Sequence, residues 1–321
     1  MSGASSAEVE LDLTITARRP LADGVIQLDL ALPSGGDLPV WGPGAHIDVM
    51  LANGDVRQYS LCGDPARLSQ WSIGVLRDTT GRGGSRFIHD TLHAGDRIAV
   101  RGPRNHFALD PATRYIFIAG GIGITPILPM IRAADAAGAE WNLAYGGRTR
   151  ASMAFRNELA AHGARVSFQP FDECGHIDLA GLLDRPGADT LIYACGPEPL
   201  LAAIEQKAAR WPMGALHVER FAAKPLDEAV RAGDFEVELA KSGRVFTIPA
   251  DRSIMEVIEA EGIDVLYSCR MGVCGSCETR VLAGEIDHRD SVLDDMDTAG
   301  NDRMIICVSR GVAGKRLVLD L

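Results

Sequence analysis

Four cysteines with an uneven spacing constrain this chain more than any other feature. Three stand in one loop, separated by four and by two residues, and the fourth comes thirty residues later: Cys269, Cys274, Cys277 and Cys307. This C-x4-C-x2-C…C spacing is the plant-type [2Fe–2S] ligand pattern. Three thiolates reach one small cluster only from a tightly curled loop, and Gly272 and Gly275 permit the positive φ angles that such a curl needs. The loop therefore predicts a [2Fe–2S] cluster.

A structural zinc site is the alternative for these thiols. Zinc usually takes its cysteines from paired C-x2–4-C knuckles, whereas here a four-residue and a two-residue gap share Cys274. The spacing favours the cluster. Cys62 and Cys174 lie outside the pattern, and we expect them to be buried or inert thiols. The odd total of seven cysteines argues against a disulfide framework and for a reducing, cytoplasmic compartment.

Composition argues against several classes of protein. The 321 residues suffice for two or three domains. The net charge of −11 argues against a nucleic-acid-binding surface and against attraction to an anionic membrane. No stretch approaches the roughly 20 apolar residues of a membrane span. We expect no signal peptide, because residues 1–10 lack its basic and apolar parts.

Short strands dominate residues 1–110. Turns rich in Gly, Pro, Asn and Asp separate runs of β-branched or alternating character, which favours an antiparallel barrel or sandwich. The expected strands are Val9–Ala17, Val25–Leu32, His46–Leu51, Gln58–Leu61, Trp71–Leu76 and Arg97–Arg101.

Strands and helices alternate in residues 111–222, which predicts a parallel, doubly wound sheet. The expected strands are Tyr115–Ala119, Trp141–Tyr145, Val166–Gln169, Thr190–Ala194 and Leu216–Glu219, and the expected helices are Pro126–Ala136, Ser152–His162, Leu179–Leu183 and Glu198–Arg210.

Residues 223–233 have no apolar face and predict a linker. A third part follows at 234–321, with a helix over Ser253–Glu261 in which Ser253 and Glu256 have the spacing of a capping box. Its expected strands are Phe235–Ala240, Arg244–Pro249, Glu278–Leu282, Met304–Cys307 and Arg316–Leu319.

A glycine-rich turn in the second part suits a nucleotide. Gly120 and Gly121 let a pyrophosphate approach the backbone, and the helix that starts near Thr125 offers free N–H groups and a partial positive charge. The spacing is not that of the G-x-G-x-x-G fingerprint, so this turn alone is weak evidence. A second turn supports it from the carboxyl end of another strand, where open α/β sheets bind ligands: Cys195, Gly196 and Pro197.

Two motifs in the first part suit a phosphate and a flat ring. Arg57 can pair with a phosphate and Tyr59, on the same strand face, can pack on a heterocycle. A later turn, ahead of a helix, supplies backbone N–H groups, a guanidinium and a hydroxyl from Arg82, Gly83, Gly84 and Ser85. Either motif alone could be a solvated strand or a flexible loop.

In order and spacing, the motifs RQYS, GRGGS, GGIGITP, CGP, HVERF and CRMGVCGSC with a distal Cys resemble those of the phthalate dioxygenase reductase family. Vanillate demethylase reductases are similar. The resemblance runs from about residue 9 to 321 and implies a multi-domain fold. Its parts are a flavin-binding antiparallel β-barrel (1–110), an NAD-binding doubly wound α/β domain (111–222) and, after the linker, an α+β β-grasp ferredoxin domain (234–321).

The resemblance also implies residue roles. The FMN ligands would be Arg57, Tyr59, Ser60, Arg82, Gly83, Gly84 and Ser85. The NADH site would include Gly120, Gly121, Thr125, Gly196, Pro197 and Asp172. Cys195 would lie near the nicotinamide ring and Phe221 would pack on the flavin face, so these two are the catalytic candidates.

Two cofactor choices stay open. FMN rather than FAD rests on the resemblance alone. Arg148 and Arg150 could bind the 2′-phosphate of NADPH, whereas Asp172 and Glu173 would favour the free ribose of NADH, to which the family leans.

A nicotinamide gives two electrons and a [2Fe–2S] cluster accepts one, so a flavin between them has to pass electrons on singly. The predicted path runs from NADH through FMN and the cluster to a partner. The resemblance implies that this partner is a terminal Rieske-type oxygenase, which would itself bind an aromatic substrate, and that the chain is a monomer. Two alternatives stay open: a reductase for a non-Rieske monooxygenase or demethylase, and a redox sensor that uses the cluster as a switch without significant NADH turnover.

Overall fold

The structure is a computed structural model that describes residues 8–81, 83–223, 233–293 and 295–321. Arg82 and most of the predicted linker lie outside these ranges. The chain divides into two compact units, Met1–Glu219 and Arg220–Leu321, and we describe each by itself. No helix in the described ranges is long and apolar enough to cross a bilayer.

The first unit begins with an antiparallel sheet of six strands in the order β4-β3-β6-β1-β2-β5. The strands are β1 (Val9–Ala22), β2 (Val25–Ala31), β3 (His46–Met50), β4 (Val56–Ser60), β5 (Trp71–Leu76) and β6 (Arg97–Arg104). A bridge between Leu61 and Ile73 joins the two edges of this order, so the sheet closes into a barrel. Leu13 and Ile15 alternate into its core, where Ile88 of helix α1 (Gly84–Thr91) joins them. The predicted barrel is confirmed.

A parallel sheet follows, in the order β11-β10-β7-β8-β9. Its strands are β7 (Arg114–Gly120), β8 (Glu140–Gly147), β9 (Val166–Pro170), β10 (Thr190–Cys195) and β11 (Leu216–Glu219). After β7, the chain first adds β8 and β9 on one side of that strand and then adds β10 and β11 on the other side. The order therefore reverses between β7 and β10, as the predicted doubly wound sheet requires.

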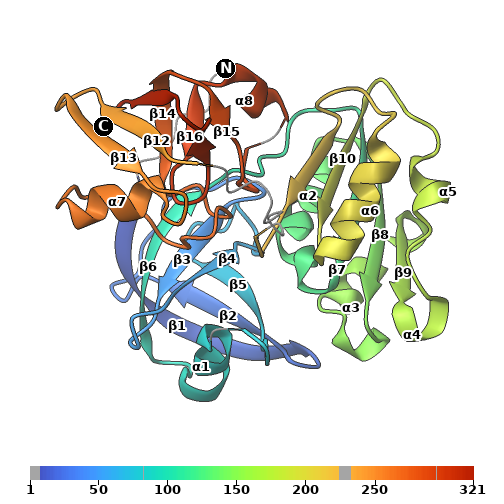
Figure 1. Cartoon of the computed structure of the whole chain (residues 1–321). Helices are drawn as coiled ribbons and strands as arrows, with labels where there is room; N and C mark the ends of the chain where they lie inside the picture. The colour runs from blue at the N-terminus through green and yellow to red at the C-terminus, as the bar shows by residue number, and fades with distance from the viewer. Residues whose placement is uncertain (1–7, 82, 224–232, 294) are drawn as a thin grey trace. The chain divides into compact units, whose positions relative to one another are not determined.

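Helices cover both faces of the parallel sheet (Figure 1). They are α2 (Ile124–Ala136), α3 (Arg156–Ala160), α5 (Leu179–Leu183) and α6 (Glu198–Ala208), whereas the short α4 (Phe171–Cys174) follows β9 and buries no side chain. Side chains of β7 alternate between two cores: Phe117 packs with Ile127 of α2, and Ile118 packs with Leu201 of α6. Both faces are apolar because both are buried.

The predicted helix Ser152–His162 is wrong. A 3-10 turn occupies Arg150–Ser152, and the helix α3 covers only Arg156–Ala160. Between them Phe155 has a φ of 57°, in the left-handed region that an α-helix cannot include.

The second unit holds a mixed sheet in the order β13-β12-β18-β14-β16 and a small pair, β15-β17. The strands are β12 (Phe235–Leu239), β13 (Arg244–Ile248), β14 (Glu278–Ala283), β15 (Ile286–Asp287), β16 (Arg303–Ile305), β17 (Arg310–Gly311) and β18 (Arg316–Leu319), and the helices are α7 (Ile254–Ala260) and α8 (Asp295–Gly300). The capping box forms as predicted: Glu256 N–H donates to Ser253 Oγ at 3.1 Å, and Ser253 N–H donates to Glu256 Oε2 at 2.8 Å.

Candidate functional site

The two predicted nucleotide turns meet backbone to backbone. A Cβ atom added to Gly123 would lie 2.3 Å from the Cys195 carbonyl oxygen, and one added to Gly196 would lie 3.0 Å from the Gly120 Cα. Only glycine fits such an approach. The carboxyl ends of β7 and β10 are thereby held together at the reversal point of the sheet, where ligands of open α/β sheets bind.

Side chains beneath the glycine turn hold its shape. Buried Thr125 donates from Oγ1 to the Ile122 carbonyl at 2.9 Å, and the Tyr145 hydroxyl donates to the Gly121 carbonyl at 3.1 Å. These bonds support the turn from below. Helix α2 begins at Ile124, so its free N–H groups open at this edge of the sheet and fit a pyrophosphate.

Glu219 is a functional candidate that our sequence analysis missed. It ends β11, directly beside Cys195 in the register of the parallel sheet. Burial raises the pKa of Glu219 to about 8, and the neighbouring Ser60 hydroxyl offsets part of that rise. Burial, with the Glu219 charge adding to it, also holds the pKa of the Cys195 thiol well above its usual range. Both groups are therefore protonated at neutral pH, and Cys195 is a neutral thiol there.

Ser60 joins the barrel to this edge of the parallel sheet. It ends β4, and both its Oγ and the Glu219 Oε2 are buried without a well-formed hydrogen bond within the described residues. Buried polar atoms rarely stay unpaired. A bound ring with polar edge atoms fits this junction, which is where the predicted flavin and nicotinamide residues come together.

We expect the rate at which NADH reduces the bound flavin to depend on pH in the wild type and not in the Glu219→Gln variant. Above pH 8 the wild-type carboxyl ionises and puts an enclosed negative charge beside Cys195 and Ser60. That charge opposes delivery of a hydride, so the wild-type rate should fall with a midpoint near this pKa. The variant, which has no such charge, should stay flat. Stopped-flow traces between pH 6 and 9.5 measure this.

Thermal unfolding over the same pH range gives an independent readout. The folded pKa lies above the unfolded value of about 4.3, so the stability that Glu219 contributes is present below pH 4.3 and is lost as the pH rises through its folded pKa of about 8. Glu219→Gln should flatten this decline. Glu140→Gln, at an exposed position that starts β8, serves as control. A wild-type profile retained by Glu219→Gln contradicts the prediction.

The two predicted flavin motifs also meet. A Cβ atom on Gly84 would lie 2.6 Å from Arg57 Nε, so the absence of a side chain lets Arg57 lie against this turn. Gly83 has a φ of 96° and precedes helix α1, whose first N–H groups open there. Arg57 pairs with Asp55 at 3.1 Å, and Ser85 Oγ accepts a hydrogen bond from Asp78 N–H at 3.1 Å. A guanidinium, a hydroxyl and a nest of N–H groups thus fit a phosphate.

The four cysteines predicted to bind the cluster converge in the second unit. All four are buried, and their sulfurs contact one another, Cys269 with Cys274 and Cys307, and Cys277 with Cys307. Backbone N–H of Met271 donates to the Cys269 sulfur at 3.3 Å. Hydrogen bonds to the ligand sulfurs stabilise the reduced form of the cluster, which carries more negative charge than the oxidised form.

The loop around the cysteines has the curl that the sequence predicts. Gly272 and Gly275 both have a φ of 71°. The Gly272 carbonyl accepts a hydrogen bond from Ser291 N–H at 2.8 Å. Arg270 stacks 3.9 Å from the centre of the Tyr267 ring and donates to Glu259 of α7 at 2.9 Å. The first half of the loop is therefore tied to α7 and to residue Ser291.

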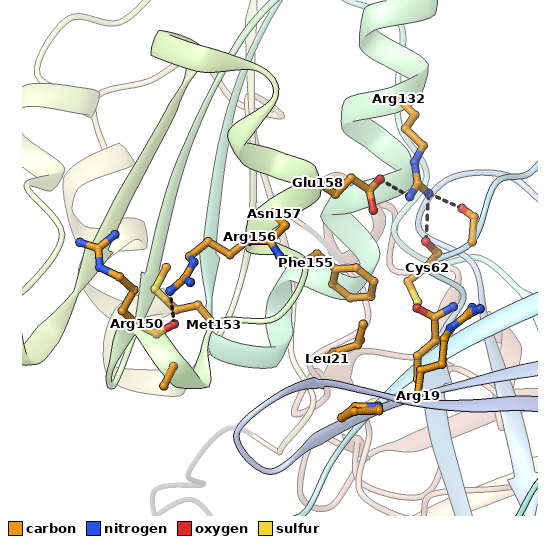
Figure 2. Close-up of a pocket in the computed structure, with 14 residues that line it drawn as sticks. Arg19, Leu21, Cys62, Arg132, Arg150, Met153, Phe155, Arg156, Asn157 and Glu158 are labelled. Carbon is orange, nitrogen blue, oxygen red and sulfur yellow. Dashed lines mark hydrogen bonds and ion pairs between the residues drawn. The ribbon is translucent and has the colours of Figure 1, made fainter.

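A cavity of about 530 Å³ lies between the barrel and the parallel sheet (Figure 2). Arg132 spans it from α2: its Nη1 donates to the carbonyls of Cys62 at 3.0 Å and Gly63 at 2.6 Å, and its Nη2 pairs with Glu158. Among the described residues, none of those predicted to bind FMN, NADH or the cluster lines this cavity. Its observed role is structural, because Arg132 ties the two halves of the first unit together.

Comparison with known proteins agrees with this layout. Residues 117–171 match the model of the oxidoreductase NAD-binding domain, and residues 237–310 match the 2Fe-2S iron-sulfur cluster binding domain. The phenoxybenzoate dioxygenase subunit beta of Ectopseudomonas oleovorans is 42% identical over 99% of this chain and 99% of its own length. The phthalate 4,5-dioxygenase oxygenase reductase subunit of Pseudomonas putida is 39% identical over 96% of both chains.

The solved structure of phthalate dioxygenase reductase, a modular structure for electron transfer from pyridine nucleotides to [2Fe–2S], superposes with a TM-score of 0.71 at 36% identity and covers 97% of this chain and 98% of its own. The chain belongs to the phthalate dioxygenase reductase family. It is thus an oxidoreductase with a flavin barrel, an NAD-binding domain and a 2Fe–2S domain, in which electrons pass from NADH through the flavin to the [2Fe–2S] cluster.

An intact type IV self-sufficient cytochrome P450 monooxygenase contains a similar region, with a TM-score of 0.92 and 42% identity over 98% of this chain. This reductase-family chain spans only 41% of that P450 chain.

All of the predicted site residues stay predictions, and three of them take no part in the side-chain contacts described above. Phe221 follows β11 and is 44% exposed. Asp172 is exposed in α4, where its backbone N–H donates to the Arg148 carbonyl at 3.3 Å. Arg82 lies outside the described residues.

Proposed function

We propose that this chain is the reductase component of a two-component oxygenase system whose terminal oxygenase is of the Rieske type. It takes electrons from NADH and delivers them, through FMN and the [2Fe–2S] cluster, to that partner. The oxygenase, and not this chain, binds the aromatic substrate. We further propose that the reductase is a cytoplasmic monomer with domains at 1–110, 111–222 and 234–321, joined by the linker 223–233.

One observation carries this proposal. Ser60 of the barrel contacts Glu219, which lies beside Cys195 at the carboxyl edge of the parallel sheet, and the Ser60 Oγ and the Glu219 Oε2 have no well-formed hydrogen bond among the described residues. A flavin held by the barrel and a nicotinamide held by the sheet would meet at this junction. FMN, when bound there, accepts an electron pair and releases the electrons one at a time.

The chain's own residues have distinct tasks in this proposal. Arg57 and the 82–85 turn hold the FMN phosphate, while Tyr59 and Ser60 orient its ring. The glycine turn and Thr125 seat the pyrophosphate, and Gly196 and Pro197 seat the nicotinamide half. Cys195 and Phe221 enclose the reacting faces and exclude water. The three loop thiolates and the Cys307 thiolate bind the cluster, from which electrons leave for the partner.

The first test is a visible spectrum before and after anaerobic addition of NADH, with the released flavin identified by mass. Flavin and cluster bands that both bleach, with FMN in the extract, support the proposal. A protein whose cluster stays oxidised under excess NADH would instead fit the redox-sensor alternative. Extracted FAD would contradict the FMN assignment.

A cytochrome P450 is the second candidate partner, and the likeness to the reductase region of the type IV P450 favours it. The two candidates separate when the NADH-reduced protein is mixed with a purified Rieske oxygenase or with a P450 haem domain. Faster reduction of the Rieske cluster supports the proposal, and faster reduction of the haem supports the second candidate.

A further inference from the structure

The proposed position of the pyrophosphate determines on which side of β7 the adenosine half of the nucleotide would lie. If the pyrophosphate lies on the glycine turn of β7, the nicotinamide half points toward β10 and Cys195. The adenosine half then points the other way, over β8 and β9. Gly120 pairs with Gly146 in the register of β7 and β8, and Gly147 pairs with Pro170 in the register of β8 and β9. The residues just beyond these positions are those that an adenosine ribose would meet.

Five charged side chains follow these two strand ends. Three are basic and two are acidic: Arg148, Arg150, Arg156, Asp172 and Glu173. Glu173 engages Arg150 in a two-point ion pair, with Arg150 Nε donating to Glu173 Oε1 at 3.0 Å and Arg150 Nη2 donating to Glu173 Oε2. The hydrogen bonds from Arg150 hold the pKa of Glu173 below its usual range, so the pair is fully charged at neutral pH.

A further bond orients this loop. Arg156 donates from Nη1 to the Arg150 carbonyl at 2.9 Å, as Figure 2 shows. Arg148 is exposed, and no side-chain partner for it occurs in the part of the chain that the structure describes. Arg150 therefore lies between Arg148 and Arg156 along the chain, and a carboxylate occupies its own guanidinium fork. A phosphate takes the same two-point geometry from arginine as a carboxylate does.

We propose that the Arg150–Glu173 ion pair masks a binding site for the 2′-phosphate of NADPH, so that Glu173 is a specificity-determining residue for NADH. NADH and NADPH differ only in that phosphate on the adenosine ribose. With Glu173 in place, a 2′-phosphate meets an occupied fork and two carboxylates. Without Glu173, the phosphate meets a free Arg150 guanidinium, and the net charge of this group of side chains rises from +1 to +2. The proposal rests on the proposed seating of the nucleotide along this sheet edge.

Binding of two adenosine nucleotides tests this without turnover. Adenosine 2′,5′-bisphosphate and 5′-AMP differ only in the 2′-phosphate, and calorimetry measures both on the full chain. Glu173→Ala should bind the bisphosphate about tenfold more tightly than the wild type does, the gain of a charge-assisted phosphate contact. Its affinity for 5′-AMP should stay within about twofold, which also shows that the site is folded.

Two further variants control the result. Arg150→Ala combined with Glu173→Ala should lose the gain, because the freed fork is gone. Glu140→Ala removes an exposed glutamate that pairs with Arg114 at the opposite edge of the same sheet, and it should leave both affinities unchanged. The proposal is overturned if Glu173→Ala gains no affinity for the bisphosphate, or if the double variant keeps the gain.

Flavin reduction by the two dinucleotides extends the test. In Glu173→Ala the ratio of kcat/KM for NADPH over NADH should rise about tenfold. An unchanged ratio in a variant that binds the bisphosphate more tightly would overturn the specificity role. Failure of both dinucleotides to reduce the wild-type flavin would instead overturn the proposed function, and the binding result would still decide whether the phosphate site exists.

Discussion

A Cys274→Ala variant should purify without its iron–sulfur cluster and yet still accept electrons from NADH. Removing one of four thiolates leaves the cluster with an open coordination position in a buried loop. Apart from Phe221, the predicted flavin and nucleotide residues belong to the other compact unit, so we expect flavin reduction within about twofold of the wild-type rate. Delivery to a Rieske oxygenase should fall about 100-fold or more, because electrons no longer have their exit. Iron content, the visible spectrum and partner reduction measure this.

The chain offers a matched control for that variant. Cys174 is an exposed thiol in the first unit, outside the four-cysteine pattern. Cys174→Ala should keep full iron content and full delivery to the partner. Iron retained by Cys274→Ala at the wild-type level would show that the ligand assignment is wrong.

Asp48→Asn should lower the free energy of unfolding of the first unit by about 3–5 kcal/mol. The Asp48 carboxylate is completely buried, and it accepts hydrogen bonds from Arg101 at 2.9 Å, Arg104 at 2.6 Å and Gln58 at 2.8 Å. An amide removes the charge that compensates two largely buried guanidiniums. Urea unfolding, followed by the fluorescence of the buried Trp71 in the barrel, measures the loss.

The same carboxylate sets an acid limit for the barrel. Burial alone raises the pKa of Asp48, but Arg104, Gln58 and Arg101 together hold it below its usual range. Its stabilising contribution is therefore complete above the unfolded pKa of about 3.9 and is lost as the pH falls through the lower folded value. Asp12→Asn, at an exposed position on β1 of the same sheet, is the control and should change stability by about 0.5 kcal/mol or less. An equal effect of both variants would contradict this role for Asp48.

Local signals in the sequence were enough for most elements. The strands Trp71–Leu76 and Leu216–Glu219 have the bounds that the apolar runs predict, and the capping box at Ser253 forms both of its bonds. The strand β1 runs on to Ala22 because it pairs first with β6 and then with β2. Such pairing is a tertiary property, and so is the order of strands in the barrel, which no run of residues reveals by itself.

The wrong prediction of a helix over residues 152–162 also shows the limit of local sequence signals. Residues 152–162 have helical composition, but Phe155 takes a left-handed conformation and packs against the core that contains Met153 and Leu159. The gain from burying Phe155 outweighs the local preference for a continuous helix.

Some residues of the candidate site could likewise be predicted from the sequence, and others could not. The cysteine spacing was sufficient to find four thiols that the structure brings together, because metal ligands leave a strict pattern along the chain. Glu219 was overlooked, although an acidic residue that ends a strand of an open parallel sheet already points to a ligand-binding edge. Its contact with Ser60 joins residues 159 positions apart and becomes visible only in the fold. The sequence indicated that Arg150 and Glu173 could each contact the nucleotide ribose or its phosphate, but it did not predict that they pair with each other.

The crossing of the two glycine turns has a consequence for engineering. Because Gly123 meets the Cys195 carbonyl and Gly196 meets Gly120, backbone contacts limit the distance between these strand ends, and Thr125 and Tyr145 hold the glycine turn in place. Apolar residues deeper in the sheet can therefore be exchanged for others of similar total volume without widening the crossing. Core design could raise the melting temperature of this unit while KM for NADH stays constant. We therefore expect thermostability and nucleotide affinity to be separately adjustable in this chain.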